Sequence, residues 1–123
     1  MKVFIADDSI EIRKRIIAML SDVERIDMIG QAENVQDAIS SIHELNPDVV
    51  ILDIRMPGGS GMDVLKTIEK RNRMPVVIML TNYPHSQYRN KCLDAGADFF
   101  FDKSREFEKV IEIVNSMSGK GIL

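Results

Sequence analysis

Reactive side chains follow the short apolar runs of this sequence, at the point where each run ends. They are three carboxylates, a hydroxyl and an ammonium, carried by Asp7, Asp8, Asp53, Thr81 and Lys103. Asp53 is the most informative of them, because it directly follows the four branched apolar residues Val49–Leu52. An ionised carboxylate at the end of a buried segment is costly unless a cation or hydrogen-bond donors offset its charge.

Together these side chains suit phosphoryl transfer. Three carboxylates brought close would repel one another, and without a counter-charge at least one would stay protonated. A divalent cation resolves the repulsion, and a few partly solvated oxygen ligands suit Mg²⁺, which keeps several waters and binds phosphate. Lys103 adds a compact positive charge and Thr81 a hydroxyl. Because a carboxylate can accept a phosphoryl group, the set is chemically complete for phosphorylation of Asp53.

The sequence also contains elements that would bring these side chains together. Five apolar runs, which we interpret as strands, alternate with segments of helical apolar spacing and lie at Val3–Ala6, Met28–Ala32, Val49–Leu52, Val76–Leu80 and Phe99–Phe101. This alternation predicts an α/β fold: a doubly wound five-stranded parallel sheet with five helices, in the flavodoxin-like order 2-1-3-4-5. Ligands of such sheets bind beyond the carboxyl ends of the strands, where Asp7, Asp8 and Asp53 would converge.

Capping residues mark the expected helix boundaries. N-caps are predicted at Ser9, Asn34 and Ser104. Ser60 and Asp63 have the spacing of a capping box, and Gly96 stands where a helix end favours a left-handed residue. The segment Ser86–Ala95 is the weakest helix prediction, because its apolar stripe is sparse.

Composition limits the class of protein. The 123 residues suit one domain, and 45% hydrophobic with 28% charged residues is ordinary for a globular chain. A net charge of −3 gives no global attraction to nucleic acid or anionic lipid, and no apolar run approaches a membrane span. The single cysteine, Cys92, agrees with a reducing compartment. We expect a single domain over residues 1–123 with no output domain, located in the cytoplasm, without direct nucleic-acid or membrane partners.

Four separated motifs resemble the receiver domain of two-component response regulators. They are "IADDS", "VVILDIRMPGGSG", "VVIMLTN" and "AGADFFFDKS", in the order and at the spacing of that family. The resemblance covers nearly the whole chain. It implies a phosphorelay signalling module whose donor is a phosphohistidine on a partner histidine kinase or phosphotransfer protein. It also implies output through a separate effector protein or through self-dimerisation.

The resemblance assigns a role to each site residue. Asp53 matches the phosphoacceptor, which would become an aspartyl phosphate. The Mg²⁺ ligands implied are Asp8 directly, Asp7 through water, Asp53, and the backbone carbonyl of Arg55. Thr81 and Lys103 match the pair that contacts the phosphoryl group. Phe100 matches the switch aromatic, which with Thr81 couples phosphorylation to the output surface by turning inward on activation.

Three features depart from the family pattern. Phe100 stands where the family often has Tyr, so its coupling would rest on packing. Ser104, and not a proline, follows Lys103, so no cis peptide is expected there. Arg55 and Tyr83, each two residues after a site residue, are bulky. They would shield the phosphoryl group from water, which predicts a long-lived phosphoaspartate.

Three other functions remain as alternatives. A receiver-like interaction module that works without phosphorylation would keep the fold, although this chain retains the full acidic set. An aspartate-nucleophile hydrolase usually carries a second acid two residues after the nucleophile, where this chain has Arg55. A flavin-binding protein would need a Ser/Thr/Gly-rich phosphate loop after the first strand, whereas the carboxylates of "DDSIE" repel phosphate.

Overall fold

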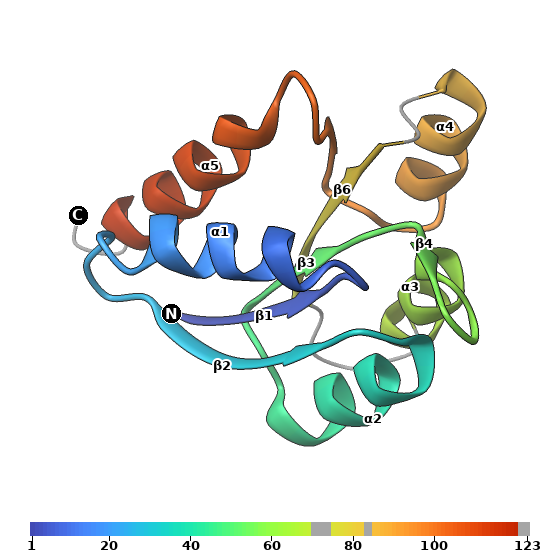
Figure 1. Cartoon of the computed structure of the whole chain (residues 1–123), viewed down its shortest axis with the longest axis horizontal. Coiled ribbons are helices and arrows are strands. Elements are labelled where there is room, and N and C mark those ends of the chain that lie inside the picture. The colour runs from blue at the N-terminus through green and yellow to red at the C-terminus, as the bar shows by residue number, and fades with distance from the viewer. Residues whose placement is uncertain (70–74, 83–84, 121–123) are drawn as a thin grey trace.

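The computed structural model describes residues 1–69, 75–82 and 85–120, which form a large sheet with helices on both faces (Figure 1). The strands of this sheet are β1 (Lys2–Ala6), β2 (Asp27–Ala32), β3 (Val49–Leu52), β6 (Val76–Thr81) and β7 (Phe99–Asp102). The helices are α1 (Ile10–Leu20), α2 (Val35–Leu45), α3 (Gly61–Glu69), α4 (Ser86–Asp94) and α5 (Phe107–Lys120). A small hairpin between β3 and α3 consists of β4 (Arg55–Met56) and β5 (Gly59–Ser60).

The strand order of the large sheet is β2-β1-β3-β6-β7, and every neighbouring pair is parallel. Since β6 and β7 are its fourth and fifth strands along the chain, the predicted order 2-1-3-4-5 is confirmed. Each predicted strand matches the observed one to within one residue at either end. The weakest helix prediction is also confirmed, as α4.

The hairpin β4–β5 differs from the prediction, which had only a turn at this point. Arg55 pairs with Ser60 and Met56 with Gly59 in an antiparallel ladder. Gly58 and Gly59 have φ angles of 90° and 148°, a region that favours glycine. The two glycines thus allow a reversal tight enough for the flanking residues to pair, which apolar periodicity could not indicate.

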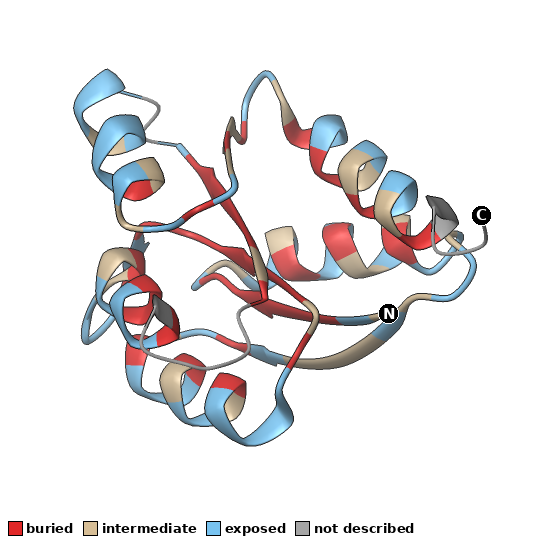
Figure 2. Ribbon diagram, turned by 180° about the vertical axis from the view of Figure 1, so that it is seen from behind, coloured by how far each residue is buried: buried red, intermediate tan, exposed pale blue. Residues whose placement is uncertain are grey.

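Two apolar layers fill the space between the sheet and its helices. Alternate strand residues point to opposite faces, so β1 contributes Phe4 to one layer and Val3 and Ile5 to the other. Helices α1 and α5 cover one face, while α2, α3 and α4 cover the other (Figure 1). Figure 2 shows the central strands β1, β3 and β6 buried almost throughout, while the edge strands β2 and β7 are mostly half-buried.

Side-chain caps begin the first three helices where they were predicted. Ser9 Oγ accepts a hydrogen bond from the Ile12 N–H at the start of α1, over 3.3 Å. Asn34 Oδ1 caps α2 in the same way. Ser60 and Asp63 form the predicted capping box of α3, since the Ser60 N–H donates to Asp63 Oδ2 over 2.9 Å.

The N-cap prediction for Ser104 is wrong. Helix α5 begins only at Phe107. The Ser104 N–H instead donates to Asp102 Oδ1 over 2.9 Å, and the Glu106 N–H bonds the Asp102 carbonyl over 2.8 Å. Asp102 therefore organises a separate turn after β7, which competes with an earlier start of the helix.

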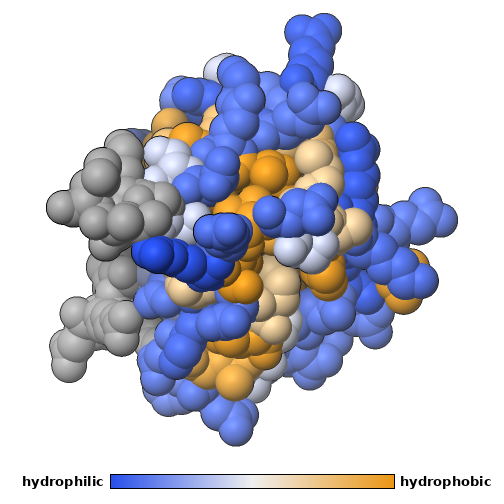
Figure 3. Space-filling view, turned by 90° about the vertical axis from the view of Figure 1, so that its left-hand side faces the viewer, coloured by the Kyte–Doolittle hydropathy of each residue, from blue (hydrophilic) through white to orange (hydrophobic). Residues whose placement is uncertain are grey.

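Apolar and hydrophilic side chains share one face of the molecule (Figure 3). Figure 3 shows the side of the molecule that faces left in Figure 1, where apolar atoms form a band bounded by hydrophilic side chains. Within the parts of the chain that the structure describes, no helix is long and apolar enough to cross a membrane.

Candidate functional site

Asp7 and Asp53 follow neighbouring strands and lie at the carboxyl edge of the sheet. Strands β1 and β3 pair up to the residue before each acid. The backbone of both acids is still held by the sheet, because the Asp7 N–H donates to the Ala32 carbonyl and the Asp53 N–H to the Ala6 carbonyl, each over 3.0 Å. Sheet pairing thus fixes these two buried acids, whereas Asp8 starts the turn toward α1 and is exposed.

The three carboxylates form a cluster that could hold a metal ion. One oxygen from each of Asp7, Asp8 and Asp53 lies within 4.8 Å of the others. Asp7 is 2% exposed and Asp53 5%, while Asp8 leaves one side of the cluster open to water. An all-oxygen donor set with an open, hydrated side fits a small hard divalent cation such as Mg²⁺.

Lys103 brings a buried ammonium to the site. Its Nζ lies 2.6 Å from Asp7 Oδ2 and 2.9 Å from Asp53 Oδ2, and its side chain is 6% exposed. The position of the residue is set by β7, because the Lys103 N–H donates to the Thr81 carbonyl over 2.9 Å. The ammonium contacts Asp7 and Asp53, and a divalent cation would oppose the charge of all three carboxylates.

Burial and neighbouring charges have opposite effects on the pKa values of Asp53 and Lys103. Burial raises the pKa of Asp53, while the Lys103 ammonium opposes that rise and the Asp7 charge adds to it. Burial by itself would favour neutral Lys103, but hydrogen bonds to Asp7 and Asp53 outweigh it and raise the pKa of the amine. Lys103 is therefore held as an ammonium, which is the form that binds a phosphoryl group.

The backbone around Asp53 leaves little room for movement. The Ile54 N–H donates to Asp53 Oδ1 over 2.7 Å, and the Gly61 N–H donates to the Ile54 carbonyl over 2.6 Å. A Cβ atom at Gly61 would overlap the Asp53 carbonyl. The first residue of α3 must therefore be glycine for the helix to approach the acid this closely.

Thr81 and Phe100 lie on the neighbouring strands β6 and β7. Thr81, the last residue of β6, is fully buried and pairs in register with Asp102. Phe100 is 4% exposed and packs in the same apolar layer as Met79 and Cys92, so its ring is turned inward. Its carbonyl accepts a hydrogen bond of 3.3 Å from Arg89 Nη1 of α4.

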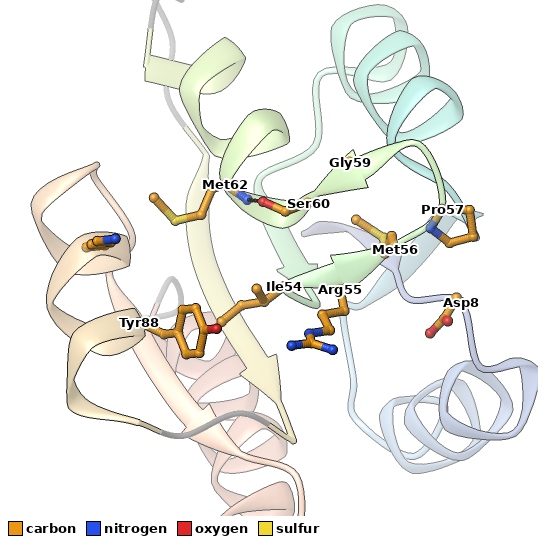
Figure 4. A pocket seen from close by; sticks show the side chains of 10 residues that line it. Asp8, Ile54, Arg55, Met56, Pro57, Gly59, Ser60, Met62 and Tyr88 are labelled. Carbon is orange, nitrogen blue, oxygen red and sulfur yellow. Dashed lines mark hydrogen bonds between the residues drawn. The ribbon is translucent and has the colours of Figure 1, made fainter.

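Arg55 lies beside the acidic cluster, in a pocket of about 570 Å³ that also includes Asp8 and Tyr88. In Figure 4 its side chain projects from β4, with Tyr88 of α4 to one side and Asp8 to the other. The Arg55 side chain is exposed, and its shielding of the site stays a prediction. Tyr83, the other residue expected to shield it, lies outside the described residues.

Sequence reasoning missed two residues that support the site, Gly61 and Arg13. Arg13 of α1 is 7% exposed, and its Nη1 donates to the Asp7 carbonyl over 2.6 Å. A signal for Arg13 exists, since it lies at helical spacing from the core residues Ile16 and Leu20 and so occupies a core-facing position. No comparable signal marks Gly61, because the close approach of α3 to Asp53 is a tertiary feature.

Comparison with known proteins agrees with this geometry. The family described as "Response regulator receiver domain" matches residues 3–115. The transcriptional regulatory protein LnrK of Bacillus subtilis is 30% identical over 123 residues, which are 100% of this chain and 56% of that protein. The chain spans about half the length of the curated relatives that it matches first.

Solved structures show the same fold. A DNA-binding response regulator of the LuxR family from Staphylococcus aureus superposes with a TM-score of 0.86 at 31% identity, over 95% of this chain and 98% of that one. The CheX–CheY–BeF3–Mg²⁺ complex from Borrelia burgdorferi contains a chain with a TM-score of 0.84 at 30% identity, over 95% of this chain and 88% of that one. On the strength of the matched residues, the shared fold and the acidic cluster, this chain belongs to the response regulator receiver domain family of two-component systems.

Proposed function

We propose that Asp53 accepts a phosphoryl group from a phosphohistidine of a partner histidine kinase or histidine phosphotransfer protein, in a Mg²⁺-dependent reaction in the cytoplasm. The chain then catalyses only its own phosphorylation and dephosphorylation. The observation that carries the proposal is the contact of Lys103 Nζ with both Asp7 and Asp53, at 2.6 and 2.9 Å. This contact supports the proposal, because a carboxylate that can act as a nucleophile and an ammonium that can bind phosphate lie 2.9 Å from each other.

Asp7, Asp8, Asp53 and the backbone carbonyl of Arg55 would hold the Mg²⁺ ion, with Asp8 as a direct ligand and Asp7 acting through water. When bound, the ion would neutralise charge on the carboxylates and on the phosphoryl oxygens. The related CheY chain solved in a complex with BeF3 and Mg²⁺ supports this choice of ion. The exposure of Asp8 supports it too, because Mg²⁺ sites keep several waters.

In the transfer step, an oxygen of Asp53 attacks the phosphorus atom of the donor. A new oxygen–phosphorus bond forms while the bond from phosphorus to the donor imidazole nitrogen breaks. The electron pair of the broken bond stays on that nitrogen, which takes up a proton. Lys103, which holds Asp53 Oδ2 in the free protein, would follow the negative charge to a phosphoryl oxygen, and the Thr81 hydroxyl would donate to another.

Thr81 and Phe100 would then pass the change to the surface of α4, β7 and α5. Movement of Thr81 toward the phosphoryl group would favour the inward position of the Phe100 ring, which is the position in this structure. Because Arg89 bonds the Phe100 carbonyl, a shift of β7 at Phe100 would reach α4 directly. The altered surface would bind a separate effector protein or a second copy of the chain.

Intact-mass measurement tests the proposal. The protein is incubated with Mg²⁺ and acetyl phosphate, a small acyl-phosphate donor, and compared with Asp53→Asn. We expect one phosphate adduct on the wild type and none on Asp53→Asn, and no adduct when EDTA replaces Mg²⁺. Asp22→Asn is the matched control, since it makes the same change at an exposed acid in the loop after α1 and should keep the adduct.

Two outcomes would replace the proposal with another function. A folded wild type that takes up no phosphate from acetyl phosphate, or from a phosphorylated histidine phosphotransfer protein, would favour the phosphorylation-independent interaction module. Continuous release of phosphate over many turnovers without an adduct would favour a hydrolase.

A further inference from the structure

Arg13 is a buried cation that the proposed transfer step does not use. It lies in the first turn of α1, is 7% exposed, and shares the sheet-facing side of the helix with Ile16 and Leu20. Burying a guanidinium is costly unless its donors are used. Its Nη1 donates to the Asp7 carbonyl over 2.6 Å and its Nε to Gln31 Oε1 over 2.8 Å, while its Nη2 lies 3.9 Å from Glu33 Oε2.

The carbonyl that Arg13 binds is the first one beyond the sheet. Strands β1 and β2 pair up to Ala6 and Ala32, and the Asp7 N–H makes the next bond, to the Ala32 carbonyl. The Asp7 carbonyl follows the last paired residue of β1, and it accepts its hydrogen bond from the Arg13 side chain. Because this carbonyl belongs to the peptide that joins Asp7 to Asp8, the bond to Arg13 fixes the peptide plane from which Asp8 departs.

We propose that Arg13 is a positioning residue for the metal site. Its hydrogen bond holds the Asp7–Asp8 peptide so that both carboxylates are oriented toward the position of the cation. This inference rests on the proposed Mg²⁺ site. The Asp7 side chain is anchored separately, by Lys103 and by the Ser9 N–H, which donates to Asp7 Oδ1 over 2.9 Å. Asp8 has no such place in the sheet, and its orientation depends on the peptide that Arg13 holds.

Arginine suits this task better than lysine. Its planar fork binds two acceptors in fixed directions at once, here the Asp7 carbonyl and the Gln31 side chain of β2. A lysine at this position would keep the charge but would lose the fixed geometry. Groups that orient metal ligands typically contribute about 10- to 100-fold to metal affinity.

Mg²⁺ binding by the metal-free protein tests the inference, with amide NMR signals of residues 7–9 and 54 as the readout. We expect Arg13→Met to bind Mg²⁺ about tenfold more weakly than wild type. We expect Arg13→Lys to fall between the two. Phosphorylation by acetyl phosphate should recover at saturating Mg²⁺, because the loss lies in metal affinity and not in the nucleophile.

Lys14→Met is the matched control, since it removes one positive charge from the same helix at an exposed position. Equal Mg²⁺ affinity in Lys14→Met and Arg13→Met would overturn the inference, because the effect would then be one of charge alone. Wild-type affinity in Arg13→Lys together with slow phosphorylation at saturating Mg²⁺ would also overturn it. If Arg13→Met does not fold, the Mg²⁺ affinity of Arg13→Lys is compared with that of Lys14→Met, and the inference predicts the weaker binding in Arg13→Lys. A wild type that binds no Mg²⁺ contradicts the proposed metal site itself, which separates the two failures.

Discussion

Lys103 and Asp53 form a buried ion pair in which Nζ lies 2.9 Å from Oδ2. The two residues follow β7 and β3, which are not adjacent, because β6 lies between them in the sheet. A second contact of the same ammonium, 2.6 Å to Asp7 Oδ2, extends the link to β1. One cation thus joins three strand ends and opposes two buried carboxylates.

Replacing Lys103 with methionine should destabilise the fold when no divalent cation is present. The substitution leaves Asp7 and Asp53 close together and uncompensated, and removing one partner of a buried ion pair typically costs about 3 kcal/mol or more. We expect urea unfolding of Lys103→Met in EDTA to show a loss of that order. Mg²⁺ should stabilise the variant more than it stabilises the wild type, since the ion replaces the missing positive charge.

Lys109→Met is the control for the loss of a lysine. Lys109 pairs with Glu106 at the surface, at 3.0 Å, and exposed pairs of this kind contribute about 0–1 kcal/mol. Equal urea midpoints for the two variants would contradict the view that Lys103 offsets buried charge.

Gly61→Ala should impair both stability and phosphate uptake. The added methyl group would overlap the Asp53 carbonyl, and relief of such overlap by backbone shifts typically costs about 1–3 kcal/mol. The shift would move the phosphoacceptor, so the rate of adduct formation by intact mass should fall.

Gly58→Ala is the control that introduces backbone strain without atomic overlap at the site. Gly58 has a φ of 90°, but a Cβ atom there would meet only ordinary contacts, the nearest at 3.8 Å to Val35. Gly58→Ala should lose stability while its phosphorylation rate stays close to wild type. A normal rate in Gly61→Ala would show that the approach of α3 does not position Asp53.

The sequence predicts the part of this architecture that rests on local patterns. Apolar runs and helical spacing indicate the strands, and the acids at the ends of β1 and β3 then converge because parallel strands end at the same edge. The Arg13 contact with the Asp7 carbonyl and the fit of Gly61 against Asp53 depend on distances across the fold, which no local pattern encodes. The β4–β5 hairpin is local, but it rests on Gly58 and Gly59 and so leaves no mark on the apolar periodicity. The prediction of an N-cap at Ser104 is wrong because Asp102 forms a competing turn after β7.

Phe100→Ala should destabilise the protein without abolishing phosphorylation. The ring is buried beside Met79 and Cys92, and removing a buried phenyl group typically costs about 3–5 kcal/mol. Asp53 and Lys103 lie outside that apolar layer, so Mg²⁺-dependent adduct formation should persist in the folded fraction. Phe101→Ala, at a half-buried position on the same strand, should lower the free energy of unfolding by less. Loss of the adduct in folded Phe100→Ala would contradict the prediction, because it would assign Phe100 a part in the phosphorylation step.

The lifetime of the phosphoaspartate tests the role of the bulky residues near the site. We expect a long-lived phosphate in the wild type and a shorter lifetime in Arg55→Ala, because the Arg55 side chain projects beside Asp8 and would restrict water. Tyr83→Ala should act in the same direction. Decay followed by intact mass after removal of the donor gives the rates. A wild-type half-life of seconds, unchanged in both variants, contradicts the prediction.

Locating the phosphate on the chain tests the central claim most directly. Wild-type protein phosphorylated with acetyl phosphate and Mg²⁺ is treated with borohydride, which reduces an aspartyl phosphate to homoserine, and its peptides are sequenced by tandem mass spectrometry. The account predicts homoserine at position 53, with Asp7 and Asp8 unchanged. Homoserine at another acid, or phosphate on a hydroxyl or histidine with Asp53 intact, would contradict it.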